Sequence, residues 1–242
     1  MSDTTKLRRV AEQLTSIFEN GTTELQYAYA ENLNDGRGIT CGRTGFCTGT
    51  GDAFEVVKRY CLRRSANPLS VFLPELRRLT SAHDSSETNG LAGYEATWRE
   101  CASDAEFRNV QDEVTNELYW VPSQRQADRL GLETNLSRAF IFDTIIQHGD
   151  DGDADSLGAL LQKTCNVFRG APSDGVDERE WLSGFITVRR ANLANCNDEA
   201  SRKEWAGSVG RCDTFRRIAE SGNFSLATPF DVEWESELYS IK

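Results

Sequence analysis

The sequence FENG at residues 18–21, NDGRGIT at 34–40 and GFCTGTGD at 45–52 interrupts an otherwise helical pattern in this 242-residue chain. It places Glu19 at the end of an apolar helix, Asp35 in a glycine-framed loop and Asp52 at the start of the next helix. Two carboxylates held in different environments are the minimum equipment for acid/base hydrolysis of a glycosidic bond. The stretch therefore predicts a hydrolytic site as well as a break between helices.

Helical spacing of apolar residues dominates the rest of the chain. Residues 5–18 read as an amphipathic helix that stops at Gly21, and a second helix follows Asp52 with acidic residues in its first turn. Glycines predict turns and short strands over 34–50, and the tail after Asn223 reads as irregular. Further helices are predicted over 69–79, 94–101, 103–119, 123–132, 135–148, 155–168, 177–195 and 199–220. The fold class is mainly α, with one small β segment.

The length fits one catalytic domain, residues 1–242, built of two lobes. The β segment lies between the first helix and the remaining helices, which is a sensible place for a substrate cleft between lobes. We expect the smaller lobe to hold the β segment over roughly 20–60, and the remainder to be mostly the helical lobe.

The composition limits the classes of partner. A net charge of −11 and a pI of about 4.8 disfavour nucleic acid, because phosphate binding requires a basic face. An acidic surface attracts a polycation, although acidity can also serve only to keep a protein soluble. The chain contains no run of about 18 apolar residues, so no membrane helix is predicted. No signal segment is seen at the start, so we expect either an intracellular protein or one whose signal has been removed.

The cysteines and acidic clusters do not predict a metal site or a cofactor. Seven cysteines include no Cys-x-x-Cys pair, and the chain has only two histidines. Cys41 and Cys47 flank a glycine-rich turn and could bridge, or they could be buried free thiols. Asp-x-Asp-x-Asp at 151–155 resembles a calcium loop, but Ser156 and Gln162 stand where Gly and Glu are required.

Glu19 and Asp35 are the candidate acid and base. Apolar neighbours of Glu19 would favour its protonated form, and the polar surroundings of Asp35 its ionised form. Each has a simpler interpretation, since Glu19 could be a solvated helix end and Asp35 a turn former. Thr40, five residues after Asp35, could hold a water near the base, or it could be only a structural strand residue.

Charged residues late in the chain could support these carboxylates. His148 lies one helical turn after Asp143, where it could contact substrate or only interact with the helix dipole. Arg189, Arg190 and Arg211 lie on two late helices. An arginine facing Glu31, Asp35 or Asp143 would form a charge network that orients catalytic carboxylates, although all three arginines could also be surface residues.

Together these residues resemble the chitosanases of glycoside hydrolase family 46, along almost the whole chain. Asp-Gly-Arg-Gly followed by Gly-Phe-Cys-x-Gly-x-Gly-Asp is the most specific part. The other matching motifs are Phe18-Glu19-Asn20, Tyr29-Ala30-Glu31-Asn32, Phe72-Leu73-Pro74, Trp98, Asp143 with His148-Gly149, Leu182-Ser183-Gly184-Phe185 with Arg189, and Gly210-Arg211 with Asp213-Thr214.

The resemblance implies a helical, lysozyme-like protein of two lobes with a cleft, acting as an endo-hydrolase that inverts the anomeric centre. It assigns the general acid to Glu19, the general base to Asp35 and placement of the attacking water to Thr40. It further implies that Tyr29, Arg37, Asp52 and His148 line or support the sugar sites, that Glu31, Asp143, Arg189 and Arg211 form a buried charge network behind the base, and that Trp98 is structural. The chain departs from the family pattern at Thr23 and Cys196 and in its seven cysteines.

The predicted substrate is therefore chitosan, a linear β-1,4-linked glucosamine polymer whose ammonium groups complement the acidic chain. We expect a monomer without a cofactor, acting outside the cell because the polymer is too large to enter it. The alternatives are a related hydrolase of chitin or peptidoglycan, a non-catalytic binder of carbohydrate or polycations, and a helical interaction protein.

Overall fold

The structure is a computed structural model that describes residues 3–34, 36–82, 86–150, 152–199 and 202–242. It is mostly helical, which confirms the predicted fold class. The chain divides into two compact units, one of Met1–Glu24 with Tyr119–Lys242 and one of Leu25–Leu118. The smaller unit includes the expected β segment together with the helices that follow it. None of the described helices is long and apolar enough to cross a membrane.

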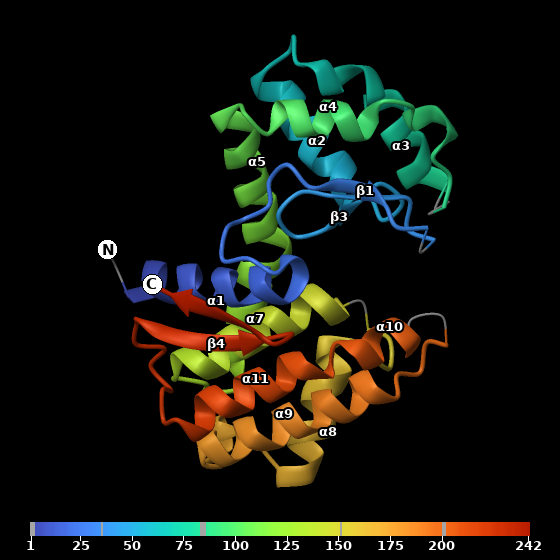
Figure 1. The fold of residues 1–242 in the computed structure, drawn as a ribbon. Coiled ribbons are helices and arrows are strands. Elements are labelled where there is room, and N and C mark those ends of the chain that lie inside the picture. Colours follow the sequence, from blue (N-terminus) through green and yellow to red (C-terminus); the bar gives the residue numbers. More distant parts are fainter. Residues whose placement is uncertain (1–2, 35, 83–85, 151, 200–201) are drawn as a thin grey trace. The chain divides into compact units, whose positions relative to one another are not determined.

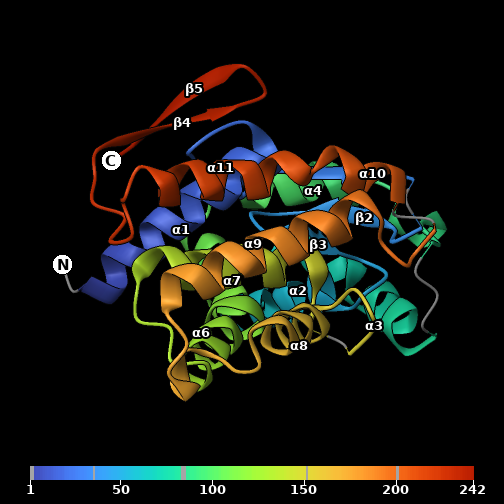
Figure 2. The same cartoon turned by 90° about the horizontal axis from the view of Figure 1, so that it is seen from below.

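The first unit is built around α7 (Asn135–His148), which is buried along most of its length. Helix α7 packs against α1 (Asp3–Asn20), α6 (Val121–Arg129), α8 (Leu157–Phe168) and α11 (Val209–Glu220). Helix α9 (Glu178–Ala194) and helix α11 run side by side (Figures 1 and 2). The unit also contains α10 (Arg202–Gly207) and a short 3-10 turn at Pro172–Asp174.

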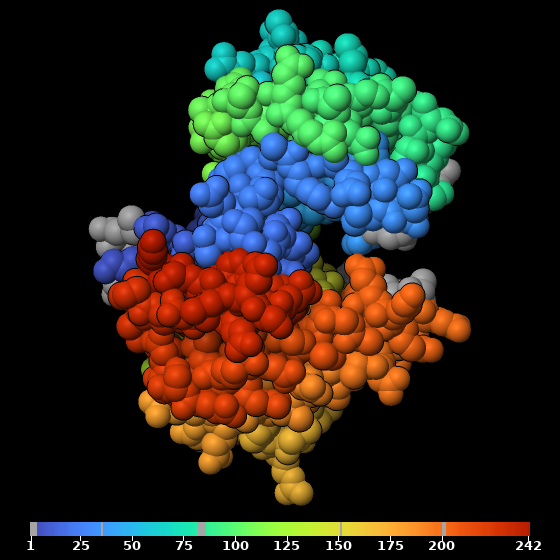
Figure 3. Space-filling view, viewed as in Figure 1, coloured from blue at the N-terminus to red at the C-terminus, as the bar shows by residue number. Residues whose placement is uncertain are grey.

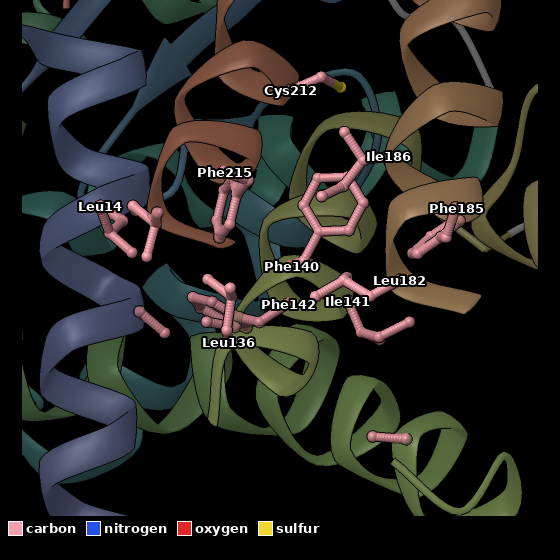
Figure 4. Close-up of a cluster of buried hydrophobic side chains, with 14 of the residues drawn as sticks. Leu14, Leu136, Phe140, Ile141, Phe142, Leu182, Phe185, Ile186, Cys212 and Phe215 are labelled. Atoms are coloured by element: carbon pink, nitrogen blue, oxygen red, sulfur yellow. The ribbon is translucent and has the colours of Figure 1, made fainter. Parts of the chain in front are cut away.

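Aromatic and aliphatic side chains from α1, α6, α7, α8, α9 and α11 and from the C-terminal tail form the core of this unit, part of which is drawn in Figure 4. Phe140 of α7 lies between Phe185 of α9 and Phe215 of α11, with ring centroids 5.0 and 4.9 Å apart. Leu14 of α1 is also fully buried. Burial of each such side chain contributes about 1.5–3 kcal/mol. The core thus fixes α1, α7, α9 and α11 relative to one another, and these helices carry the charged residues described below.

The prediction of an irregular tail after Asn223 is wrong. The tail forms a hairpin of β4 (Phe230–Trp234) and β5 (Glu237–Ile241). Its turn residues Glu235 and Ser236 adopt positive φ angles of 49° and 68° without the usual Asn-Gly signature, which is why the sequence did not reveal the hairpin. The hairpin, red in Figure 3, contacts α1 and α11. Trp234 packs edge-on against Phe18, with ring centroids 5.0 Å apart.

The predicted helices differ from the observed ones mainly at their ends. The predictions for 94–101 and 135–148 match α4 (Tyr94–Cys101) and α7. The predicted helix 199–220 is two helices, α10 and α11, in its described part. In place of the predicted helix 69–79, the structure has a 3-10 turn, Pro68–Phe72, followed by α3 (Leu73–Ala82). In place of the predicted helix 103–119, it has α5 (Ala105–Thr115) followed by a π turn, Asn116–Trp120.

The second unit joins a small antiparallel sheet to α2 (Asp52–Arg63) and helices α3–α5. Its strands are β1 (Ala30–Asn32), β2 (Ile39–Cys41) and β3 (Phe46–Cys47), in the order β1-β2-β3. A short 3-10 turn, Asn89–Leu91, precedes α4. Trp98 is fully buried, and its Nε1 donates to the Tyr27 carbonyl at 2.9 Å. The tryptophan thus ties α4 to the chain that leads into β1.

Candidate active site

Glu19 lies in the last turn of α1, at the edge of the core of the first unit. Ile17 and Phe18 are buried, whereas the Glu19 side chain is 40% exposed. Its Oε1 accepts a hydrogen bond of 2.6 Å from Nη1 of Arg211. The sequence predicts apolar neighbours for Glu19, but in the structure the Arg211 guanidinium contacts its carboxylate. The apolar side chains position the end of α1, and Arg211 positions the Glu19 carboxylate.

Asp143 is the centre of a buried charge network. Its Oδ1 accepts from Arg211 Nη2 at 2.9 Å and from Thr15 Oγ1 at 3.1 Å, and its Oδ2 accepts from Arg189 Nη1 at 2.7 Å. The side chains of Asp143 and Arg189 are fully buried, and that of Arg211 is 4% exposed. The network therefore links α1, α7, α9 and α11 through one carboxylate.

The electrostatics of this network favour the charged forms of Asp143 and Arg211. Burial alone would raise the pKa of Asp143, but the two guanidiniums outweigh it and hold the pKa below its usual value. For Arg211, burial would lower the pKa, and the charges of Asp143 and Glu19 raise it instead. Each guanidinium also lies near an aromatic ring, Arg211 over Phe18 and Arg189 over Phe140.

His148 follows the network at the end of α7 and is buried, with 5% of its surface exposed. Its Nδ1 lies 2.9 Å from the Asp155 carbonyl, and a carbonyl only accepts, so Nδ1 carries the hydrogen. Burial and, after it, the charge of Arg189 lower the pKa of His148 to about 3. The imidazole is therefore neutral at neutral pH. Trp205 of α10 packs edge-on against the ring, with centroids 4.6 Å apart.

The Asp155 carboxylate holds the segment that follows α9. It accepts from the side-chain amides of Asn192 and Asn197, each at 2.6 Å, and from the backbone N–H groups of Asn197 and Asp198. These bonds occupy the oxygens that a calcium ion would need. Asp151, the first residue of the calcium-like motif, lies outside the described residues. No metal-binding group of His, Cys, Asp and Glu occurs among the residues that the structure describes.

Asp155 should make folding sensitive to acid. Burial would raise its pKa, but the hydrogen bonds lower it from 3.8 to about 2. A depressed pKa adds stability that is complete above pH 3.8 and is lost as the pH falls toward 2. We expect the excess stability of wild type over Asp155→Asn, about 2 kcal/mol at pH 6, to shrink steadily below pH 4. Urea unfolding of both proteins at several pH values measures this, and a constant difference would contradict it.

The carboxylate of Asp52 stabilises the turn before α2 in the second unit. Its Oδ1 accepts from the backbone N–H groups of Cys47 and Ala53 at 2.8 and 3.0 Å, and from Thr50 Oγ1 at 2.7 Å. Burial raises the pKa of Asp52 despite these hydrogen bonds, which act in the opposite direction. One oxygen thus closes the glycine-rich loop, and the side chain remains partly exposed.

The other predicted site residues lie on the sheet or beside it. Thr40 is buried on β2 and pairs in register with Glu31 of β1. Glu31, expected in the buried network, is exposed, and its Oε2 accepts from the Tyr29 hydroxyl at 3.3 Å. Arg37 is exposed. Asp35, the predicted base, lies outside the described residues.

The structure brings together Glu19, Asp143, Arg189 and Arg211, and separately Tyr29 with Glu31. It also adds two residues that the sequence reasoning missed, Thr15 and Gln147. Each lies four positions from a predicted residue on the same helix, Thr15 before Glu19 and Gln147 after Asp143. Spacing of one helical turn was the signal that could have identified them.

Cys41 and Cys47 do not form the bridge that the sequence allowed. All seven cysteines are free thiols. The Sγ of Cys41 donates to the Phe46 carbonyl, and that of Cys47 to the Gly45 carbonyl, both at 3.2 Å. Hydrogen bonds from the thiols to backbone carbonyls therefore accompany this turn, which has no disulfide.

Comparison with known proteins identifies the family of this chain. Residues 13–230 match the family model of glycosyl hydrolase family 46. The chain is 49% identical over 225 residues to a chitosanase of Bacillus subtilis (strain 168), covering 93% of this chain and 81% of that protein. It also resembles a crystal structure of a mutant chitosanase from Bacillus subtilis MY002 complexed with 6 GlcN, with a TM-score of 0.94, 47% identity and 98% of both chains covered.

A second solved structure shows the same likeness at lower identity. The Gynuella sunshinyii GH46 chitosanase in complex with chitotetraose has a TM-score of 0.94 and 39% identity, again with 98% of each chain covered. Both the family match and the relatives extend over nearly the entire sequence. The resemblance drawn from the sequence motifs is thus confirmed, and the chain belongs to glycosyl hydrolase family 46.

Proposed function

We propose that this protein hydrolyses chitosan as an endo-acting, inverting glycosidase. The observation that carries the proposal is near-complete coverage by a glycoside hydrolase family whose similar members are named chitosanases, one of them crystallised with 6 GlcN. The net charge of −11 supports a cationic polymer as substrate, because acidic surfaces attract ammonium groups. A neutral or anionic polymer such as chitin or peptidoglycan gains nothing from this charge.

Glu19 is proposed as the general acid. Arg211 occupies its Oε1, and no described residue donates a hydrogen bond to its Oε2, so Oε2 is the oxygen that can deliver a proton to the leaving glycosidic oxygen. Arg211 is itself fixed by Asp143, and Asp143 by Arg189. The buried network therefore holds the carboxylate in one orientation, which is what a proton donor to a fixed bond needs.

The remaining roles are proposed from the family resemblance. Asp35 acts as the general base toward a water that Thr40 helps to place, and Glu31 supports the general base. The residues proposed to line or support the sugar sites are Tyr29, Arg37, Asp52 and His148. Of these, the neutral and buried His148 supports rather than pairs with an ammonium group.

The place of action and the oligomeric state are part of the same proposal. Chitosan is too large to enter a cell, so we infer an enzyme that acts outside it. An endo-acting hydrolase needs only one chain to enclose its polymer, and we propose a monomer. Size-exclusion chromatography with light scattering would test the latter directly.

Proton NMR during the first minutes of chitosan hydrolysis tests the reaction itself. Inversion of a β-linkage releases α-anomeric ends first, before mutarotation, and endo-cleavage releases oligomers rather than monomer. We expect early α signals and a rapid fall in polymer length. Early β signals would exclude inversion, and binding of the polymer without any product would favour a non-catalytic binder.

A further inference from the structure

Gln147 has no role in the proposed mechanism, yet it is directly bonded to the buried network. It lies on α7, one turn after Asp143 and next to His148. Its Oε1 accepts a hydrogen bond of 2.8 Å from Nη2 of Arg189, whose Nη1 binds Asp143. The series of contacts that begins at Glu19 therefore passes through Arg211, Asp143 and Arg189 and ends at Gln147.

Both ends of this series reach solvent, and its middle does not. Asp143 and Arg189 are fully buried, whereas Glu19 is 40% exposed and Gln147 is partly exposed. The amide of Gln147 cannot be turned around, because a guanidinium only donates and must face the amide oxygen. Its Nε2 therefore faces away from Arg189, and no described residue accepts a hydrogen bond from it.

Gln147 thus offers two N–H donors, and the one lone pair left on its oxygen lies beside the Arg189 guanidinium. The ammonium group of glucosamine only donates, and the positive charge of that guanidinium repels it, so an ammonium is disfavoured at this amide. Hydroxyl groups both donate and accept, so they would bind an amide or a carboxylate equally well. The acetyl carbonyl of an N-acetylglucosamine unit only accepts, and it is the group on partly acetylated chitosan that complements such a site.

We propose that Gln147 is a substrate contact that donates its amide N–H to the acetyl carbonyl of an N-acetylglucosamine unit, and that it thereby sets the tolerance of the enzyme for acetylated residues. This inference rests on the proposed chitosan hydrolysis. Arg189 provides the orientation, since it binds the amide oxygen and leaves the N–H donors directed away from the guanidinium.

The substitution Gln147→Glu tests the contact with little change in size. A carboxylate oxygen still accepts from Arg189, but the exposed amide group becomes an anionic acceptor, which repels a carbonyl oxygen and attracts an ammonium group. We expect the ratio of kcat/KM on partly acetylated chitosan to kcat/KM on fully deacetylated chitosan to fall about tenfold. The thermal unfolding midpoint should stay close to that of wild type.

Gln162→Glu is the matched control. Gln162 is an exposed residue of α8 in the same unit, and its Nε2 donates to Asn166 Oδ1. The control changes the net charge by the same amount at a site that the proposal does not involve. We expect its kcat/KM ratio to equal that of wild type, which separates a local contact from general attraction of the polycation.

Each possible failure has a distinct meaning. If wild type releases no product from any chitosan, the proposed function fails and the role of Gln147 fails with it. If wild type is active and the ratio for Gln147→Glu stays within twofold of wild type, only the role of Gln147 is overturned. Equal loss on both polymers would assign Gln147 to support of Arg189 alone and would also overturn the proposal, as would the same shift in Gln162→Glu.

Discussion

The substitution Glu19→Gln should lower kcat on chitosan by about a hundred- to ten-thousandfold, which is the usual contribution of a general acid. The amide has the size of the carboxylic acid, and its oxygen can still accept from Arg211 Nη1, so the end of α1 should keep its position. What disappears is the proton that the leaving oxygen requires. Initial rates of reducing-end release, with circular dichroism to verify the fold, measure the effect.

Glu220→Gln provides the control for this substitution. Glu220 is exposed at the end of α11 in the same unit, so its substitution removes one negative charge far from the network. Wild-type turnover is expected for the control. If Glu19→Gln kept more than a tenth of the wild-type kcat, the assignment of Glu19 as the acid would be wrong.

The substitution Asp143→Asn should destabilise the first unit by about 3–5 kcal/mol, the usual cost of breaking a buried ion pair from one side. Asp143 accepts from Arg189, Arg211 and Thr15 without any exposed surface. An asparagine retains one acceptor oxygen and turns its N–H donors toward a guanidinium that also donates. The buried guanidiniums of Arg189 and Arg211 then lose the buried carboxylate that neutralises them. Thermal unfolding should show a fall in Tm of roughly 10 °C.

Asp213→Asn is the matched control, because Asp213 also pairs with an arginine in the same unit but at the surface. Its Oδ1 accepts from Arg190 Nε at 2.8 Å, and the two side chains are 33% and 42% exposed. Exposed pairs contribute at most about 1 kcal/mol, so this variant should unfold close to wild type. Similar losses in the two variants would mean that burial of the Asp143 network does not carry its stability.

The prediction from sequence succeeded where local rules were sufficient. Helices 94–101 and 135–148 were predicted with their observed bounds, because their apolar residues follow helical spacing and a Gly precedes the first and follows the second. The break between α10 and α11 falls at Gly207-Ser208, which are residue types typical of helix ends, so the prediction of one helix over 199–220 missed a local signal there. The hairpin at 230–241 was missed because its turn lacks Asn-Gly and its strands are held by contacts with α1 and α11.

The candidate site shows the same division. Glu19, Asp143, Arg189 and Arg211 were all named from the sequence, but which arginine contacts which carboxylate was not. These residues are separated by up to 192 positions, and only packing of α1, α7, α9 and α11 around the aromatic core brings them within hydrogen-bond distance. The exposure of Glu31 and the burial of His148 likewise depend on neighbours from distant segments.

By itself, the sequence determined the mainly helical class, the family and the identity of the charged residues, because residue types, spacing and motifs are properties of the chain. The tertiary structure alone decided that Arg211 contacts the proposed acid and that Arg189 orients the amide of Gln147. Hydrogen bonds and ion pairs act over about 3 Å, and the chain reaches that proximity only after apolar burial has fixed its helices side by side.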